Sequence, residues 1–434
     1  MKVIEVESEV LKAMIKRIGV VAAPDRSVIV RSVKGKGGWY VQCVCASRDE
    51  TVETVITAPV KSADEGAEAV ISSAEFALAD CVASMEETVS VRISDKGDCV
   101  DFLGKNSNVS LRTLSVGVGF VNPDPENGRF SMEIDRERFL SLLKNSLKFV
   151  GEEERVRNVL LHAKEQSLTA YGCNGNCLCY ATAPCRVMPG KKWEDACGQH
   201  ELQDGELPGC DTAIPGGFVS YLVSSLSLST AQIVSAILDN KYLFLRYDDS
   251  SIIGVRLAAS FVQVSRFRQL MDAAGGTCLA LEKSALEGAV RLLKKRLAAE
   301  RNDSMKRSLS IHLKTENGKL IASVANNRVA VGILENSETD ADAYFNPEYL
   351  DAAISTCAAG NVLVKVMEKP AGIVLGNGSV EGGVSPEAFQ TMILVVNPEY
   401  ARQSESKFAS GDYGDGNEGE KAKDKKAGKK KKEE

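Results

Sequence analysis

The alternation of apolar and polar residues repeats along the chain. Residues 4–11, 132–140 and 279–286 begin with apolar residues at every second position and then change to a spacing of three and four. Alternation is typical of a strand with one buried face, and the wider spacing is typical of an amphipathic helix. Each stretch therefore predicts a strand that runs directly into a helix, and Ser8 and Asp135 have side chains suited to N-capping two of these helices.

Paired strand-like segments follow each predicted helix. Residues 28–33 and 39–44 flank a Gly-rich turn, and the same arrangement recurs within residues 158–171 and 310–324. Two alternating segments around a short turn predict an antiparallel hairpin. A strand, a helix and a hairpin thus occur in the same order three times.

A second half-unit also occurs three times. Residues 70–76, 213–218 and 344–350 each predict the start of a helix, and two further strand-like segments follow each of them. The residues at these helix starts suit an N-cap or a first turn: Ser72, Pro215, and Asn346 with Pro347. The sequence therefore predicts an α+β fold of three similar domains, each made of two helix-plus-antiparallel-sheet halves. We expect the domains at residues 1–121, 129–260 and 277–398, with an insertion at about 189–211 in the second.

Length and composition agree with several soluble domains. A chain of 434 residues is too long for one hydrophobic core, and its apolar and charged fractions, 44% and 26%, are ordinary for globular proteins. We expect no membrane span, since no apolar run reaches about 18 residues, and no signal peptide, since acidic residues occur near the start. A cytoplasmic protein with reduced thiols follows from these expectations.

Residues 401–434 differ in composition from the rest of the chain. They are rich in Gly, Ser, Asp, Glu and Lys and poor in apolar residues. Such a segment buries too little surface to offset the entropy of ordering, so we expect a disordered charged tail. It either solubilises the protein or tethers it weakly to nucleic acid.

The first predicted helix of each domain has a basic pair opposite its apolar stripe. The pairs are Lys12 and Lys16, Lys144 and Lys148, and Arg291 and Lys295. Residues four apart lie on one face of a helix. The second helix of each domain has no such pair. One interpretation is three solvated faces, and the other is a shared surface that contacts phosphates without reading base sequence.

Four short motifs occur in an order that resembles a known family. They are Asn174-Gly-Asn-Cys-Leu, Ala325-Asn-Asn, Phe345-Asn-Pro-Glu-Tyr-Leu and Val395-Val-Asn-Pro. With the sixfold half-unit pattern they resemble the bacterial DNA polymerase III beta subunit, the replicative sliding clamp, over about residues 1–400.

The resemblance implies a head-to-tail homodimer that closes into a DNA clamp ring around double-stranded DNA. It implies a processivity factor for DNA replication, not an enzyme, that needs no cofactor or metal and works in the cytoplasm on the nucleoid. A DNA polymerase and a clamp loader would be its partners. The residues that would line the DNA are Lys12, Lys16, Arg26, Lys144, Lys148, Arg291 and Lys295.

The resemblance also implies a pocket for partner peptides. Its candidate residues are Cys173, Gly175, Asn176, Cys177, Leu178, Val262, Arg266, Phe267, Val395, Val396, Asn397, Pro398 and Glu399. Asn176 and Cys177 replace a His-Arg pair of the family, and Asn397 and Glu399 are polar where apolar residues are common. These departures indicate a divergent clamp with its own partners.

Two other functions stay open. The thiols Cys173, Cys177, Cys179, Cys185, Cys197 and Cys210, with His200, could support a zinc- or thiol-dependent enzyme. The paired knuckles that make a zinc signal strong are absent, and no phosphate-binding loop or hydrolase motif occurs. A clamp-like decoy that binds a polymerase or loader without forming a ring is the second alternative.

Overall fold

The computed structural model consists of two compact units. The first contains Met1–Gly172 and Thr182–Val262, and the second contains Cys173–Ala181 and Gln263–Glu434. The structure describes residues 1–21, 26–35, 38–46, 52–114, 128–153, 156–164, 166–191, 210–238, 242–248, 251–257, 261, 264, 269, 271, 278–299, 309–336, 341–368, 371–380, 383–384 and 388–410.

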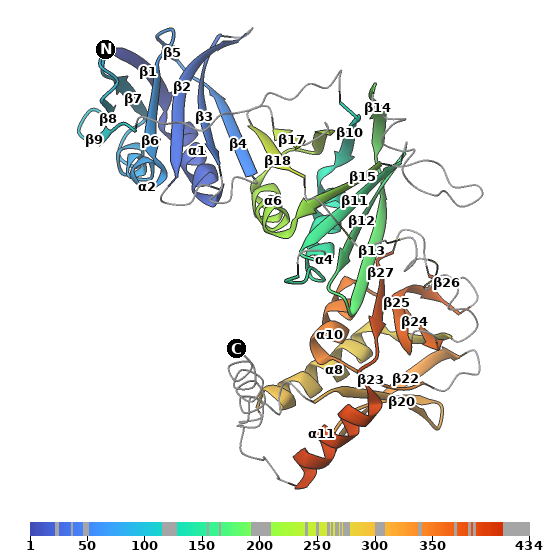
Figure 1. The fold of residues 1–434 in the computed structure, drawn as a ribbon. Helices are drawn as coiled ribbons and strands as arrows, with labels where there is room; N and C mark the ends of the chain where they lie inside the picture. Colours follow the sequence, from blue (N-terminus) through green and yellow to red (C-terminus); the bar gives the residue numbers. More distant parts are fainter. Residues whose placement is uncertain are drawn as a thin grey trace, which may run out of the picture. The chain divides into compact units, whose positions relative to one another are not determined.

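The first unit is built from antiparallel sheets (Figure 1). A five-stranded sheet has the order β5 (Ser62–Ala63), β1 (Lys2–Glu7), β7 (Thr88–Ile93), β8 (Cys99–Leu103) and β9 (Asn108–Arg112). A nine-stranded sheet has the order β14 (Arg186–Pro189), β10 (Phe130–Asp135), β16 (Ile233–Leu238), β17 (Tyr242–Asp248), β18 (Ser251–Arg256), β4 (Val52–Pro59), β3 (Gly38–Ala46), β2 (Ser27–Gly35) and β6 (Glu68–Ser72). A further set has the order β15 (Cys210–Pro215), β11 (Asn158–Lys164) and β12 (Ser167–Cys173).

The helices of the first unit pack against one another. They are α1 (Ser8–Val21), α2 (Ser73–Phe76), α3 (Ala79–Ala83), α4 (Arg136–Leu147) and α6 (Gly216–Leu228). Helix α1 packs against α3, α4 packs against α6, and α1 also touches α6. The predicted helix after Ser72 is therefore two short helices, α2 and α3.

The N-caps of these helices agree with the sequence in two cases. Asp135 accepts the backbone N–H of Arg138 at 2.9 Å, and Ser72 accepts that of Glu75 at 3.1 Å. The prediction for Ser8 is wrong, because Ser8 is the first residue of α1. Its buried hydroxyl has no hydrogen-bond partner within the described residues.

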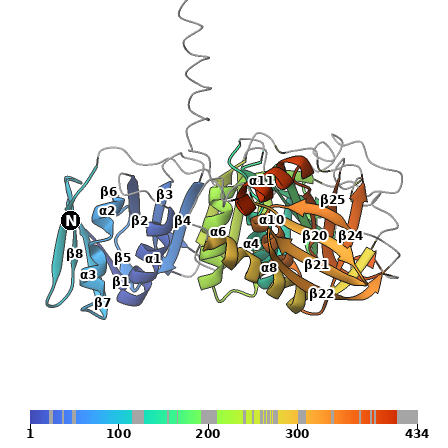
Figure 2. The same cartoon turned by 90° about the horizontal axis from the view of Figure 1, so that it is seen from below.

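One long sheet runs through the second unit. Its order is β13 (Cys177–Pro184, of which Cys177–Ala181 belong to this unit), β27 (Gln390–Leu394), β25 (Ala371–Ser379), β24 (Asn361–Glu368), β19 (Cys278–Glu282), β22 (Asn327–Asn336), β21 (Lys319–Val324), β20 (Ile311–Glu316) and β23 (Asp342–Phe345), and β26 (Gly383–Val384) pairs with β25. Helices α8 (Lys283–Ala298) and α10 (Pro347–Thr356) lie side by side against it (Figure 2). The Lys294 ammonium of α8 links the two helices, because it forms ion pairs with Glu348 at 2.7 Å and Asp351 at 2.6 Å, both on α10.

The structural repeat is visible in strand pairing. Helices α1, α4 and α8 each begin directly after a strand, namely β1, β10 and β19. Each of these strands also pairs with the chain segment that follows or ends a long strand. Strand β1 pairs with β5, which follows β4, β10 pairs with β14, which follows β13, and β19 pairs with the end of β22. The α+β class with antiparallel sheets is thus confirmed. The first unit contains the first two predicted domains except for Cys173–Ala181, and the pairing of β4 with β18 joins them in one sheet.

The domain boundaries stay predictions. The linker at residues 122–127, that at 273–276, and most of the 189–211 insertion lie outside the described residues. None of the helices within the described ranges combines the length and the apolar character needed to cross a membrane.

Helix α11 (Pro398–Ser410) corrects one prediction. Residues 401–410 belong to this helix and not to a disordered tail, and Ala401 and Ser404 are buried. Asn397 accepts the backbone N–H of Glu399 at 2.9 Å, as Asn346 does for Glu348 at the start of α10. The motif Asn-Pro-Glu-Tyr thus starts both helices, whereas the average composition of residues 401–434 concealed the second one. Residues 411–434 lie outside the described part.

Candidate functional site

Three cations occupy equivalent places on α1, α4 and α8. Lys16, Lys144 and Arg291 each lie nine residues beyond the end of the preceding strand, which is Glu7, Asp135 or Glu282. All three are exposed, and 62% of the Arg291 side chain is accessible to solvent. The repeated fold therefore presents a cation at the same helical position three times.

The buried faces of the helices determine which side these cations occupy. The buried residues are Leu11, Met14, Ile15 and Ile18 in α1, Phe139, Leu142, Leu143 and Ser146 in α4, and Leu286, Ala289, Val290, Leu293 and Leu297 in α8. Two further leucines of α4, Leu140 and Leu147, are half-buried. The exposed cations lie on the side of each helix away from the core.

The other predicted DNA-lining residues differ in exposure. Lys148 and Lys295 are exposed, one turn after Lys144 and Arg291. Lys12 is half-buried, and its ammonium donates to Glu9 Oε1 at 2.8 Å. Arg26 is half-buried directly before β2.

Not every helix presents charge. Helix α6 exposes Ser224 and Ser227, whose hydroxyls donate to the carbonyls of Ser220 and Val223. It carries no acidic residue in its first turn and no basic residue in its last turn. The basic character belongs to the first helix of each repeat, as the sequence predicts. Lys12, Lys16, Lys144 and Lys148 lie in the first unit, with Arg26, and Arg291 and Lys295 lie in the second.

Part of the predicted partner pocket comes together in the second unit. Asn174 closes the turn after β12, because its Oδ1 accepts the N–H groups of Asn176 at 3.1 Å and Cys177 at 2.8 Å. Gly175 adopts a φ of 88°, a conformation that favours glycine. The carbonyl of Asn176 accepts the N–H of Leu394 at 2.9 Å, so this turn lies beside the end of β27.

The second wall of that region leads into α11. The N–H groups of Val395 and Val396 donate to Ala371 and Tyr344 at 3.1 and 2.7 Å, and both valines are half-buried. Asn397, Pro398 and Glu399 are exposed, while Cys173, Cys177 and Leu178 are buried. Of the remaining candidates, Val262, Arg266 and Phe267 lie outside the described residues.

The candidate thiols are packed rather than activated. Cys173, Cys177, Cys179 and Cys210 are buried, and Cys185 is half-buried. Burial raises the pKa of Cys177 far above its usual value, and it raises the pKa of Cys185 to about 11. A raised pKa keeps a thiol protonated and weakly nucleophilic. In the part of the chain that the structure describes, no three His, Cys, Asp or Glu side chains are grouped to hold a metal, and Cys197 and His200 lie outside that part.

Solved structures of bacterial clamps share this fold. A DNA polymerase III beta subunit of Thermotoga maritima matches with a TM-score of 0.69 at 11% identity, over 92% of this chain and 100% of its own. A DNA polymerase sliding clamp of Pseudomonas aeruginosa matches with a TM-score of 0.70 at 14% identity, over the same shares. A Helicobacter pylori beta clamp bound to a DNA ligase peptide matches with a TM-score of 0.68 at 12% identity, over 91% and 100%.

The chain has the fold of the bacterial beta clamps. The resemblance expected from the repeated half-units and the four motifs is therefore confirmed at the level of fold. No family model and no curated protein matches the sequence. At 11–14% identity the likeness concerns the fold, and function is argued from the residues of this chain.

Proposed function

We propose that this protein is a DNA sliding clamp, a homodimeric ring that encircles duplex DNA and holds a replicative DNA polymerase on its template. The equivalence of Lys16, Lys144 and Arg291 carries the proposal. In a ring, three matched cations per copy would face the DNA as a repeated, sequence-independent contact. Such contacts permit sliding, since retention comes from topology and not from tight binding.

The strand edges support closure by a second copy. Within the chain, β18 pairs with β4 and β27 pairs with β13, so the last strand of one repeat meets the long strand of another. The last strand of the first repeat is β9, and the long strand of the third repeat is β22. Among the described strands, β9 pairs only with β8, and the first half of β22 pairs only with β21. We expect β9 of one copy to pair with β22 of the other, twice per dimer.

Exposed apolar side chains lie near these edges. Leu292 on α8 is 55% exposed, and Met85, after α3, is 72% exposed. Within the first unit, α1 already touches α6 of the neighbouring repeat. A corresponding contact between α8 and the α2–α3 region of a second copy would cover Leu292.

Partner peptides from the polymerase and the clamp loader would bind near the turn at residues 173–178 and the segment 395–399. The Helicobacter pylori clamp was solved with a DNA ligase peptide, which supports peptide binding by this fold. We propose no catalytic activity, because the thiol chemistry of the alternative enzyme would need a lowered pKa and Cys177 has a raised one. The protein would act in the cytoplasm, on the nucleoid.

Retention on DNA tests the topological claim. The full chain is incubated with a nicked circular plasmid, passed through a sizing column, and then treated with a restriction enzyme that cuts the plasmid once. A clamp coelutes with the circle and is released by the cut. Equal retention before and after the cut would contradict encirclement.

The mass in solution separates the clamp from the decoy. Sedimentation equilibrium at micromolar concentration should give the mass of a dimer of the 46.6 kDa chain. A monomer that still binds a polymerase would favour the decoy.

A further inference from the structure

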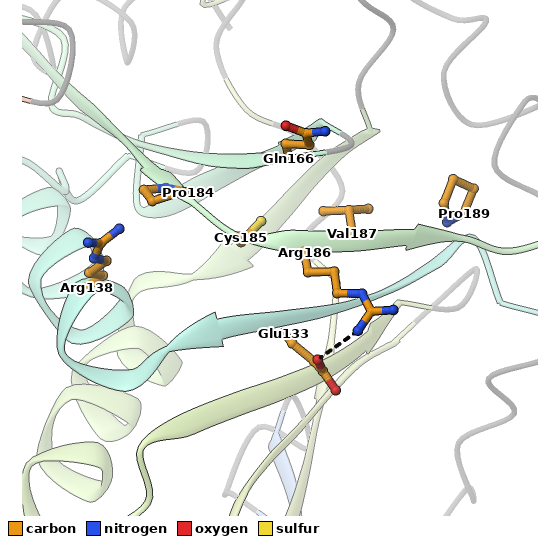
Figure 3. Close-up of a pocket in the computed structure, with 8 residues that line it drawn as sticks. All are labelled: Glu133, Arg138, Gln166, Pro184, Cys185, Arg186, Val187 and Pro189. Atoms are coloured by element: carbon orange, nitrogen blue, oxygen red, sulfur yellow. Dashed lines mark ion pairs between the residues drawn. The ribbon is translucent and has the colours of Figure 1, made fainter.

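A polar groove lies at one corner of the first unit (Figure 3). Its volume is about 720 Å³, within the range of small-molecule and peptide sites. It forms where β13 ends at Pro184 and the chain enters β14. Gln166, directly before β12, Arg138, in the first turn of α4, and Glu133 of β10 also line it.

The first repeat contains the equivalent corner. Strands β4 and β13 both end in Thr-Ala-Pro, at Pro59 and Pro184. In both cases the residue after the proline donates its backbone N–H across the corner. Val60 donates to the Trp39 carbonyl and Cys185 donates to the Gln166 carbonyl, each at 3.1 Å. Trp39 and Gln166 therefore occupy equivalent positions.

The side chains at these equivalent positions differ in character. Val10 and Arg138 each lie three residues beyond the end of the preceding strand. In the first repeat, Val10 and Val60 pack against the hydrophobic core cluster. In the second repeat, Arg138 and Cys185 stand in their places and the corner is open. The charged and polar lining of this corner thus distinguishes the second repeat from the first.

Two arginine side chains in the groove make few charge contacts with other described residues. Arg138 is exposed, and within the described residues its guanidinium has no hydrogen-bond or ion-pair partner. Arg186 is 75% exposed, and its nearest acid is Glu133 at 4.0 Å, across the pair β10–β14 (Figure 3). Among the described residues that line the groove, two guanidinium groups and one partly exposed carboxylate give a net positive charge.

The strand at the groove also offers backbone groups. Strand β14 is the edge of the nine-stranded sheet, where β10 is its only partner among the described strands. An extended peptide can add to such an edge through main-chain hydrogen bonds. Val187 of β14 is buried, and Pro184 and Pro189 add apolar surface to the lining of the groove.

We infer that this groove binds an extended acidic segment of a protein partner, whose carboxylates contact Arg138 and Arg186 and whose backbone pairs with β14. Arginine binds carboxylates in a bidentate manner, which suits a short acidic segment. Two arginines beside Glu133 are few for nucleic acid, since phosphate binding relies on several cations along the backbone. The site is a second docking surface, independent of ring closure and of the residues proposed for the partner pocket.

Binding of a defined peptide to the full chain tests the inference. The probe is a fluorescent, end-capped peptide with alternating valine and glutamate, and a peptide with lysine in place of glutamate is its charge control. Fluorescence anisotropy should show binding of the acidic peptide alone. Arg138→Glu with Arg186→Glu should weaken it at least about tenfold, because both charge-assisted contacts are lost and like charges then face each other.

The matched control is Arg92→Glu, an exposed arginine on β7 of the same unit, which should leave peptide affinity unchanged. Thermal melting of each variant shows whether it is folded. Alkylation of Cys185, followed by mass spectrometry, locates the peptide, since bound peptide should slow this reaction and not that of the exposed Cys81.

Three results would overturn the inference. They are equal binding of both peptides, unchanged affinity in the folded double variant, and binding of a short single-stranded DNA that the double variant loses while no peptide binds. The dimer mass and plasmid retention do not depend on Arg138 or Arg186, so failure here leaves the proposed clamp function to its own tests.

Discussion

The imidazole Nδ1 of His162 lies 2.5 Å from Asp211 Oδ1, and the two residues are direct partners across β11 and β15. Their side chains are 18% and 23% exposed. Asp211 lies four residues before the N-cap of α6, so the pair holds the strand that leads into this helix.

The same register position pairs a basic residue with an acidic residue in all three repeats. Arg31 lies opposite Glu68 across β2 and β6, and Lys314 lies opposite Asp342 across β20 and β23. In the third repeat, His312 Nε2 lies 2.7 Å from Asp342 Oδ1. The acid lies four residues before the N-cap in each case, which indicates a common device for fixing the edge strand before the second helix.

We expect Asp211→Ala to destabilise the first unit by about 1–3 kcal/mol, because it leaves a mostly buried imidazole without its acceptor. Glu68→Ala is the matched control. The Arg31–Glu68 distance is 3.9 Å and Glu68 is 55% exposed, so its loss should cost less than about 1 kcal/mol. Urea denaturation of the full chain, followed by circular dichroism, measures both. An equal loss in the two variants would contradict the structural role given to His162.

The matched cations make a quantitative prediction for DNA binding. Replacing Lys16, Lys144 and Arg291 together by Glu should weaken binding to duplex DNA uniformly across sequences. The slope of the logarithm of affinity against the logarithm of salt concentration should fall by about 3 per copy, one for each lost phosphate contact. The control carries Glu at Lys96, Lys105 and Lys319, which are exposed lysines in loops or directly after a turn. If both triple variants change the slope equally, general charge and not the helical surface governs binding.

Gly172 tests how closely α4 sits on its sheet. A Cβ at Gly172 would lie 2.0 Å from the carbonyl oxygen of Ser146, at the end of α4. The atoms nearest to this Cβ are all backbone atoms of Ser146, which cannot move aside as a flexible side chain could. We therefore expect Gly172→Ala to cost about 3 kcal/mol of folding stability. Gly288→Ala, in an exposed and open part of α8, should instead stabilise by about 0.5–1 kcal/mol. Thermal melting of the two variants should show shifts of opposite sign.

The cap of α11 separates local from global stability. Asn397→Ala removes the acceptor for the Glu399 N–H, which should cost the helix about 1 kcal/mol. Since α11 lies at the end of the described chain, we expect faster hydrogen exchange in α11 with little change in the main melting transition. Asn346→Ala removes the equivalent cap of α10, which packs on α8, and should lower the melting temperature itself. A matching shift in both variants would mean that α11 is integral to the core.

Local sequence patterns predicted individual elements well. Strands β7 (Thr88–Ile93) and β8 (Cys99–Leu103) are the two strands expected after residues 70–76, because each alternates over one buried face and ends at a turn. The caps Ser72 and Asn346 were equally readable, since an N-cap depends only on residues within one turn. The repeated Asn-Pro-Glu-Tyr motif offered the same signal for α11.

Relationships between distant segments were not readable. The pairing of β4 with β18 depends on edges that no local pattern identifies. The register of the helices was also unclear, since an apolar stripe fixes the buried face but not the alignment between repeats. Counting from the end of the preceding strand, Lys12 is equivalent to Leu140 and Glu287, whereas Lys16 is equivalent to Lys144 and Arg291. This alignment needs the strand ends, which the structure supplies.

Thiol reactivity distinguishes a packed cysteine cluster from a catalytic one. Since burial raises the pKa of Cys185 to about 11, its thiolate fraction, and hence its alkylation rate, should rise about tenfold per pH unit up to that value. Cys43 and Cys177 are buried with strongly raised pKa values, so they should react only after unfolding. Cys81 is exposed and should react first in the native protein. Time-resolved iodoacetamide labelling with mass spectrometry measures these rates, and rapid labelling of Cys177 near pH 7 would instead favour the thiol enzyme.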